Sequence, residues 1–159
     1  VKLLRDHGRS ESGEVEFWGF NSRLDNIQAA FLNYYFEFYE ETISRRRNIA
    51  EIYFENLREV SELHLPPSME DSDNFDVFQN YEIQAKNRDE LKEYLRENGV
   101  GTLIQWGGKA VHQFKNLGFN QVLPYTEELF TKLLMLPINM TISDEEVVYV
   151  SKKIKEFYS

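Results

Sequence analysis

The sequence contains no cysteine, which excludes disulfide frameworks, zinc fingers and thiol nucleophiles. It has no apolar run near the ~18 residues of a membrane span, and the longest hydrophobic stretch of its C-terminal half covers only residues 133–136. Positive charge is scarce, since 18 Lys and Arg stand against 27 Asp and Glu, a net charge of −9. Such a chain is a poor general binder of nucleic acid or anionic membranes, so we expect neither as a partner.

The overall composition is that of a globular protein. The 159 residues are 42% hydrophobic and 28% charged, which suits one ordinary folded domain. Residues 1–5 begin with valine, do not form a secretory signal and read like the end of a helix. We therefore expect a piece of a longer protein, with a trimmed complete domain as the alternative.

Apolar residues spaced by three and four predict helices at residues 24–38 and 43–57. Ser22, followed by Asp25, is the predicted N-cap of the first helix, and the prolines at 66–67 are predicted to stop the second. Further helices are predicted at residues 87–98, 110–117, 126–135 and 143–157. Capping boxes are predicted to open the first and the last of these four.

Alternating residues predict a strand at residues 75–85, and a second short strand is predicted at 100–106 before a glycine turn. Residues 68–74 are predicted to form an acidic loop. A few strands covered by several helices make a two-layer α+β domain the predicted fold class.

Two motifs invite functional interpretations that fail. Lys109 follows two glycines, but a phosphate-binding P-loop needs Gly where Leu103 stands and Ser or Thr where Ala110 stands. The histidines at 7, 64 and 112 are scattered, so we expect no metal site. The basic run at 45–47 is interpreted as the solvated face of a helix, paired with Glu40, Glu41 and Glu51.

Two features of the first predicted long helix indicate contacts, one with a second domain or subunit and one with an anion. The aromatic residues Tyr34, Tyr35, Phe36, Phe38 and Tyr39 surround the helix, which predicts burial against a second domain or subunit. Residues 19–23 stand at its predicted N-terminus, where free N–H groups favour anions. With Asn21 and Arg23 beside it, this is the best anion-binding candidate, and ordinary capping is the alternative.

Together these residues resemble the DegT/DnrJ/StrS family of sugar aminotransferases. Leu-Arg-Asp-His-Gly at residues 4–8 and Gly-Phe-Asn-Ser-Arg-Leu-Asp-Asn-Ile-Gln-Ala-Ala at 19–30 are similar to the segment that follows the cofactor lysine. Other matching segments follow in the family's order at 45–50, 65–67, 86–91, 99–102, 136–137 and 143–147.

The resemblance implies the C-terminal portion of an aspartate-aminotransferase-like, fold type I enzyme. Its implied chemistry uses pyridoxal 5'-phosphate (PLP) to move an amino group, usually from glutamate, to a nucleotide-linked keto-sugar. Such reactions serve surface polysaccharide, lipopolysaccharide or glycan biosynthesis in the cytoplasm, and the full-length enzyme is a homodimer. The implied division is the end of the large PLP domain at 1–23, connecting and dimer helices at 24–65, and a small domain at 66–159.

The resemblance also assigns roles. The family's Schiff-base lysine lies upstream of residues 4–8, so no catalytic residue is expected here and the chain alone is expected to be inactive. Asn21 matches the asparagine that reaches the PLP phosphate of the other subunit, and Arg23 is expected near the sugar nucleotide. Residues 103–113 depart from the common pattern and resemble the subgroup that aminates C3 of a dTDP-linked 3-keto-6-deoxyhexose. There, Gln105, Trp106 and His112 are the expected substrate contacts.

Two alternatives stay open. A related PLP-dependent sugar dehydratase replaces the lysine with histidine, and the segment that would decide it is upstream. A non-catalytic binding or regulatory domain on the same scaffold is the other.

Overall fold

The computed structural model describes residues 1–69 and 75–159, so part of the acidic loop predicted at 68–74 lies outside the described residues. The chain forms two compact units, residues 1–40 and 41–159. The division into three parts at residues 1–23, 24–65 and 66–159 stays a prediction. No helix in the described ranges is both long and apolar enough to cross a membrane.

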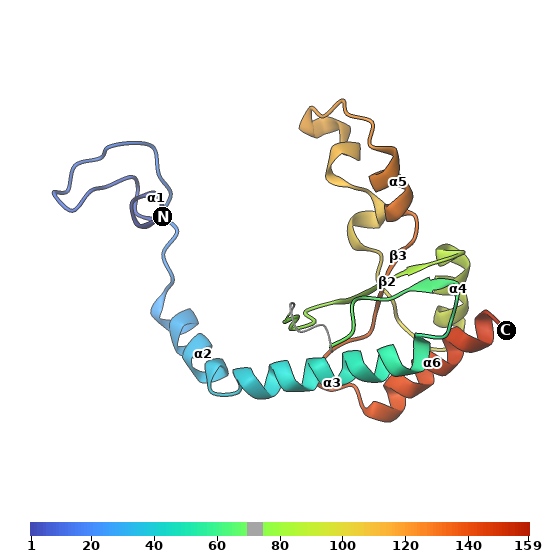
Figure 1. Ribbon diagram of the computed structural model, residues 1–159. Coiled ribbons are helices and arrows are strands. Elements are labelled where there is room, and N and C mark those ends of the chain that lie inside the picture. The colour runs from blue at the N-terminus through green and yellow to red at the C-terminus, as the bar shows by residue number, and fades with distance from the viewer. Residues whose placement is uncertain (70–74) are drawn as a thin grey trace. The chain divides into compact units, whose positions relative to one another are not determined.

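A three-stranded antiparallel sheet forms the centre of the second unit (Figure 1). Its strands lie in the order β1 (Leu63–His64), β2 (Tyr81–Ala85) and β3 (Leu133–Leu136). Ile83 of β2 lies opposite Leu134 of β3. Because side chains alternate between the faces of a strand, Tyr81, Ile83 and Ala85 are all buried on one face.

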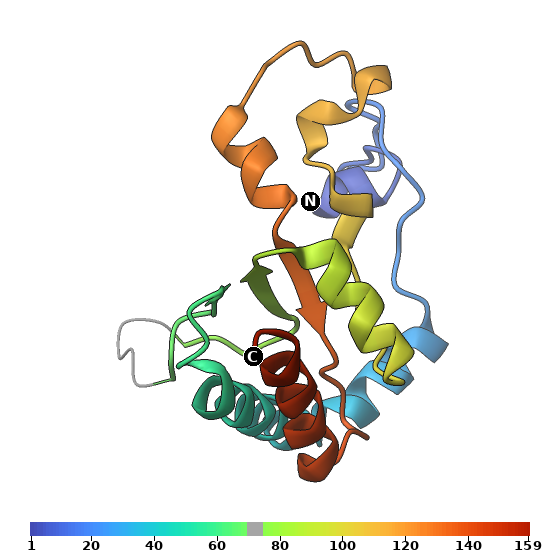
Figure 2. The same cartoon turned by 90° about the vertical axis from the view of Figure 1, so that its right-hand side faces the viewer.

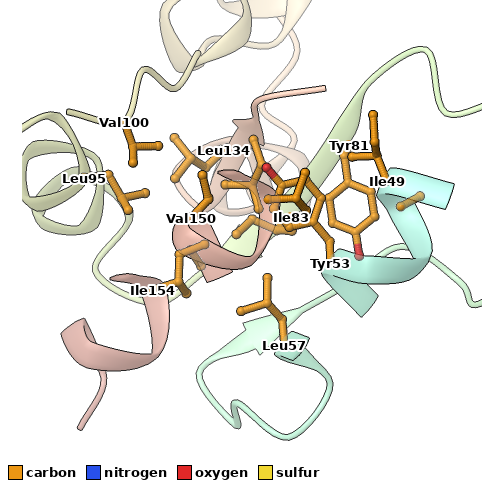
Figure 3. Packing of buried hydrophobic residues seen from close by; sticks show 14 of the residues in the cluster. Ile49, Tyr53, Leu57, Tyr81, Ile83, Leu95, Val100, Leu134, Val150 and Ile154 are labelled. Atoms are coloured by element: carbon orange, nitrogen blue, oxygen red, sulfur yellow. The ribbon is translucent and has the colours of Figure 1, made fainter. Parts of the chain in front are cut away.

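Three helices cover that face: α3 (Tyr39–Leu57), α4 (Arg88–Glu97) and α6 (Asp144–Phe157). Figure 2 shows α3 and α6 side by side below the strands. Their buried side chains meet those of the sheet in one apolar core (Figure 3), which includes Ile49, Tyr53, Leu57, Leu91, Leu95, Val147, Val150 and Ile154. Sheet and helices thus make two layers, and the predicted α+β class is confirmed.

The basic run of α3 is not a solvated face, so that interpretation was wrong. Arg45 donates to the carboxylate of Asp144 and to the carbonyl of Ile142, both at 2.5 Å. Arg46 donates to the carbonyls of Phe78 (3.1 Å) and Gln79 (2.9 Å). Arg47 donates to the carbonyl of Asp76 at 2.6 Å, and its guanidinium lies 4.3 Å from the ring centre of Phe75. The three arginines join α3 to two loops, because their donors satisfy carbonyls that no strand pairs.

Two of the predicted helix ends are confirmed and two differ from the prediction. Ser143 caps α6 and forms the predicted capping box with Glu146. Glycine at 99 ends α4 with a φ of +77°, as predicted. Asn87 precedes α4, but in a left-handed conformation and without a side-chain cap. The prolines at 66–67 do not stop α3, which already ends at Leu57, before β1.

The C-terminal half differs most from the prediction. The helix predicted at 126–135 is α5 (Pro124–Phe130) followed by strand β3, because an apolar run of four residues has no period that separates helix from strand. The strand predicted at 100–106 is a single bridge from Leu103 to Met135. The strand predicted at 75–85 is confirmed only over β2. The helix predicted at 110–117 is two short 3₁₀ turns, η2 (Val111–Gln113) and η3 (Lys115–Leu117).

The first unit contains α1 (Lys2–Arg5), an extended loop and α2 (Asn26–Phe36). The N-cap of α2 is Asp25, whose carboxylate accepts from the backbone N–H of Gln28 at 2.8 Å. Ser22, the predicted cap, instead donates its backbone N–H to the carbonyl of Arg5 at 2.9 Å. The helix therefore begins four residues after Ser22, which moves its N-terminus away from Asn21 and Arg23.

The aromatic residues at the end of α2 and the beginning of α3 are exposed in the first unit. Between 42% and 65% of each of Tyr34, Tyr35, Phe36, Phe38 and Tyr39 is accessible. They contact one another, with the rings of Tyr34 and Phe38 5.3 Å apart and edge to face. Their burial against a second subunit or domain stays a prediction.

Candidate functional site

Two glycines shape the loop of the first unit. Gly8 has a φ of +74°, and a Cβ there would lie 1.8 Å from the carbonyl oxygen of Phe17. A Cβ on Gly19 would lie 2.2 Å from the backbone nitrogen of Gly8. Only glycine fits at either position, because two backbone segments cross there without room for a side chain. The glycines of the two motifs, at residues 4–8 and 19–23, thus allow those motifs to lie against each other.

Asp6 connects the two motifs through its carboxylate. It accepts a hydrogen bond from Arg9 at 2.9 Å and lies 3.6 Å from a guanidinium nitrogen of Arg23. The hydrogen bond from Arg9, helped by the charges of Arg9 and Arg23, lowers the pKa of Asp6. Asp6 therefore stays ionised at neutral pH and holds Arg23 close to the loop.

Asn21 and Arg23 lie together, on an extended segment before α2. The Nε of Arg23 donates to the side-chain oxygen of Asn21 at 3.2 Å, and both residues are exposed. This bond uses the oxygen of the amide, so the amide nitrogen of Asn21 remains as a donor, as does the outer guanidinium nitrogen of Arg23 that does not face Asp6. The carboxylate of Asp25 caps the N-terminus of α2, and the anion-binding role of Asn21 and Arg23 stays a prediction.

A cavity of about 1060 Å³ lies in the second unit. It is formed by η1 (Gln105–Gly108), η2, η3 and α5, which stand on the side of the sheet away from α3 (Figures 1 and 2). Trp106, His112, Lys109, Lys115, Phe114 and Phe130 are among its lining residues. Apolar walls with a few polar and cationic groups are typical of a small-molecule site.

Trp106 stands at the edge of this cavity in an unusual conformation. Its φ is +52° and 72% of the residue is exposed. A bulky residue in the left-handed region is strained, and such strain concentrates at functional sites. Gln105 is exposed and lines a smaller neighbouring cavity of about 210 Å³, which it shares with Trp106.

His112 is buried, with 6% of its side chain accessible. Its Nε2 lies 3.0 Å from a carboxylate oxygen of Glu127, which comes from α5. The same oxygen accepts the backbone N–H of Leu123 at 3.1 Å. The backbone hydrogen bond, then that with His112, lowers the pKa of Glu127.

The predicted site residues thus fall into two places. Trp106 and His112 line one cavity and Gln105 its neighbour, whereas Asn21 and Arg23 form a pair in the first unit. Sequence reasoning missed Glu127, which carries no local motif and comes 15 residues after His112 along the chain. No three His, Asp or Glu side chains of the described residues gather as a metal site would require.

This architecture is that of fold type I sugar aminotransferases. The structure of S. venezuelae DesV matches 99% of this chain and 43% of its own with a TM-score of 0.88 at 26% sequence identity. That of a DegT DnrJ EryC1 StrS aminotransferase from Brucella abortus covers 99% of this chain and 42% of its own, with a TM-score of 0.87 at 28% identity.

The chain belongs to the DegT/DnrJ/EryC1/StrS aminotransferase family, whose sequence profile matches residues 1–155. It is 34% identical over 161 residues to the pleiotropic regulatory protein of Geobacillus stearothermophilus. It is 30% identical over 162 residues to the dTDP-3-amino-3,6-dideoxy-alpha-D-galactopyranose transaminase of Aneurinibacillus thermoaerophilus. Each match covers 99% of this chain, which spans only 43% of the length of either relative. The predicted family is confirmed.

Proposed function

We propose that this chain is the C-terminal portion of a PLP-dependent aminotransferase that moves an amino group from glutamate to a dTDP-linked keto-deoxysugar. The observation that carries the proposal is the family match over residues 1–155. The similarity to a dTDP-amino-sugar transaminase supports the substrate class. The large domain with its Schiff-base lysine belongs to the rest of the enzyme, so the chain alone is inactive.

The donors of the first unit are chemically suited to the PLP phosphate. The amide nitrogen of Asn21 and the guanidinium of Arg23 are exposed and adjacent, and a phosphate oxygen accepts from both kinds of group. Asp6 limits the net charge of this pair, since its carboxylate lies 3.6 Å from Arg23. When bound, PLP supplies the electron sink for amino transfer. The part of Asn21 is to bind and orient that phosphate across a dimer, and the part of Arg23 beside it is to contact the sugar nucleotide.

The cavity of the second unit suits the sugar nucleotide. The exposed indole of Trp106 offers a flat face for stacking, and Lys109 and Lys115 bring positive charge for a diphosphate. His112 and Gln105 supply hydrogen-bonding groups for sugar hydroxyls. The apolar walls around Phe114 and Phe130 exclude water from the bound sugar.

The direct test uses the full-length protein with PLP, glutamate and a dTDP-linked 3-keto-6-deoxyhexose. Mass spectrometry should detect the amino sugar, and 2-oxoglutarate should form in equal amount. Asn21→Asp would place a carboxylate beside the phosphate and should weaken PLP binding by at least tenfold, since a like charge disfavours the contact. Asn26→Asp, on the exposed start of α2, is the matched control and should leave PLP binding unchanged. Absence of any amino sugar with the full set of substrates would contradict the proposal.

A second candidate is a binding or regulatory role on the same scaffold. It is favoured by two relatives with regulatory names, the pleiotropic regulatory protein and the erythromycin biosynthesis sensory transduction protein EryC1 of Saccharopolyspora erythraea, which is 30% identical over 159 residues. Binding of a dTDP-sugar by a full-length protein that releases no 2-oxoglutarate from glutamate would favour this candidate over the enzyme.

A further inference from the structure

The hydrogen bond between His112 and Glu127 joins two elements of the cavity wall. His112 comes from η2 and Glu127 from α5, and their atoms meet at 3.0 Å although 15 residues separate them. Glu127 also accepts the N–H of Leu123, next to the start of α5. One carboxylate thus holds a buried imidazole and the backbone at the beginning of a helix.

This contact determines the protonation of the imidazole at one atom. An ionised carboxylate has only acceptors, so the proton of the hydrogen bond must be on Nε2 of His112. The lowered pKa of Glu127 keeps the carboxylate ionised at neutral pH. In a neutral imidazole with Nε2 protonated, Nδ1 is an acceptor. Within residues 1–69 and 75–159, no hydrogen bond to Nδ1 of His112 is present.

We propose that Glu127 is a positioning residue of the sugar-nucleotide site: it holds His112 with Nε2 protonated, so that Nδ1 accepts a hydrogen bond from a hydroxyl of the nucleotide-linked sugar in the cavity. The inference rests on the proposed function for the identity of the ligand. It assigns Glu127 no contact with the substrate, because its carboxylate acts through His112. Lys109 and Lys115 line the same cavity and bind the anionic part of the ligand.

The test compares Glu127→Gln with Glu128→Gln in the full-length protein. The control removes the same charge from the next residue of α5, which pairs with Lys132 at 2.5 Å and is exposed. Proton NMR of histidine-labelled protein should show a protected Nε2–H of His112, identified by its loss in His112→Asn. This proton should exchange about tenfold faster in Glu127→Gln, because a neutral amide is a weaker acceptor than a carboxylate. In Glu128→Gln its exchange should not change.

The binding measurement uses dTDP-glucose as the probe. Glu127→Gln should weaken its binding about fivefold to tenfold by calorimetry, the effect of one misplaced hydrogen bond. Glu128→Gln should bind like the unaltered protein, and Glu127→Asp should recover part of the affinity. An unprotonated Nε2, or equal dTDP-glucose affinity in the two glutamine variants, would overturn the assignment. A protein that aminates no sugar but shows the expected proton and affinity pattern would support the role of Glu127 and contradict the proposed function.

Discussion

The two units of this chain differ in what stabilises them. Residues 41–159 bury an apolar core in which Leu134, Ile83 and Tyr53 are fully inaccessible. Residues 1–40, all of which the structure describes, bury only Gly8, and α2 has no buried residue. The second unit follows the usual rule that burial drives folding. The first is held by crossing backbone hydrogen bonds, such as that from the N–H of His7 to the carbonyl of Phe20 at 3.0 Å.

Because of this difference, apolar residues in the sequence have a different meaning in the two units. In the second unit, apolar periodicity marks side chains that are buried in the core of that unit. In the first unit, the apolar side chains of α2 lie on the surface. The conformation of the loop there depends on its glycines and on Asp6. Truncating apolar side chains should therefore lower the stability of the second unit more than that of the first. Adding a single methyl group at Gly8 should instead destabilise the first unit.

The largest expected effect comes from a matched pair of leucines. Leu134→Ala in β3 removes a fully buried side chain and should lower the free energy of unfolding by about 2–5 kcal/mol. Leu32→Ala in α2 truncates a side chain that is 47% exposed and should cost less than about 1 kcal/mol. Denaturant unfolding of the 159-residue chain by itself measures both. Equal losses would mean that α2 is as firmly packed as the core.

Arg46 tests whether the basic run of α3 joins elements rather than meeting solvent. Arg46→Met removes the donors to the carbonyls of Phe78 and Gln79 and should cost about 1.5–3 kcal/mol, the range for hydrogen bonds from a charged group. Arg58→Met, at the residue that follows α3, loses exposed ion pairs with Glu55 and Glu59 and should cost less than about 1 kcal/mol. The same denaturant series measures both, and an Arg46 variant as stable as the Arg58 variant would refute the joining role.

Gly8→Ala should destabilise the crossing backbone segments of the first unit and leave the second unit unchanged. Its Cβ would meet the carbonyl of Phe17, and its φ of +74° is strained for alanine, so we expect a local cost of about 1–3 kcal/mol. Hydrogen exchange at the amides of His7 and Phe20 should accelerate, while amides of β2 keep their protection. Gly13→Ala has a similar φ of +89° but free space around the Cβ, and should show a smaller acceleration. Unchanged exchange in Gly8→Ala would show that the two motifs do not cross as described.

Glu127 gives the smallest effect, and it depends on pH. Its folded pKa lies below the ordinary 4.5, so its stabilising contribution is present above that value and is lost as pH falls through the folded pKa. Glu127→Gln should therefore be less stable than the unaltered protein at neutral pH, and the difference should shrink in acid. Thermal unfolding at neutral and acidic pH measures this difference. A gap that widens on acidification would contradict the hydrogen bonds assigned to Glu127.

Much of the fold was predictable where the signal is local. The capping box at Ser143 and the apolar spacing after it predict α6, because both features lie within one helix. β3 was not predictable in the same way, since Leu133–Leu136 reads equally as part of a helix until β2 pairs with it. Asp25 rather than Ser22 caps α2, and the backbone N–H of Ser22 instead donates to the carbonyl of Arg5, a long-range contact with no local sequence signal.

In the candidate site, too, residues with a local sequence signal were predictable, and contacts between distant segments were not. Trp106 and His112 stand in the segment at 103–113 that resembles a substrate loop, so sequence could nominate them. The burial of His112 and its partner Glu127 arise from the packing of α5 against η2. No spacing rule links the two residues, and only the fold brings them together.

The proposed aminotransferase activity is tested by measuring amino-sugar formation by the full-length protein and by its variants Trp106→Ala and Tyr125→Ala. Trp106 lines the cavity, whereas Tyr125 is an aromatic residue of α5 that is 83% exposed and outside it. We expect amination of a dTDP-linked 3-keto-6-deoxyhexose, with the KM for the sugar raised about tenfold in Trp106→Ala through loss of stacking and unchanged in Tyr125→Ala. No amino sugar, or equal KM in the two variants, would contradict it.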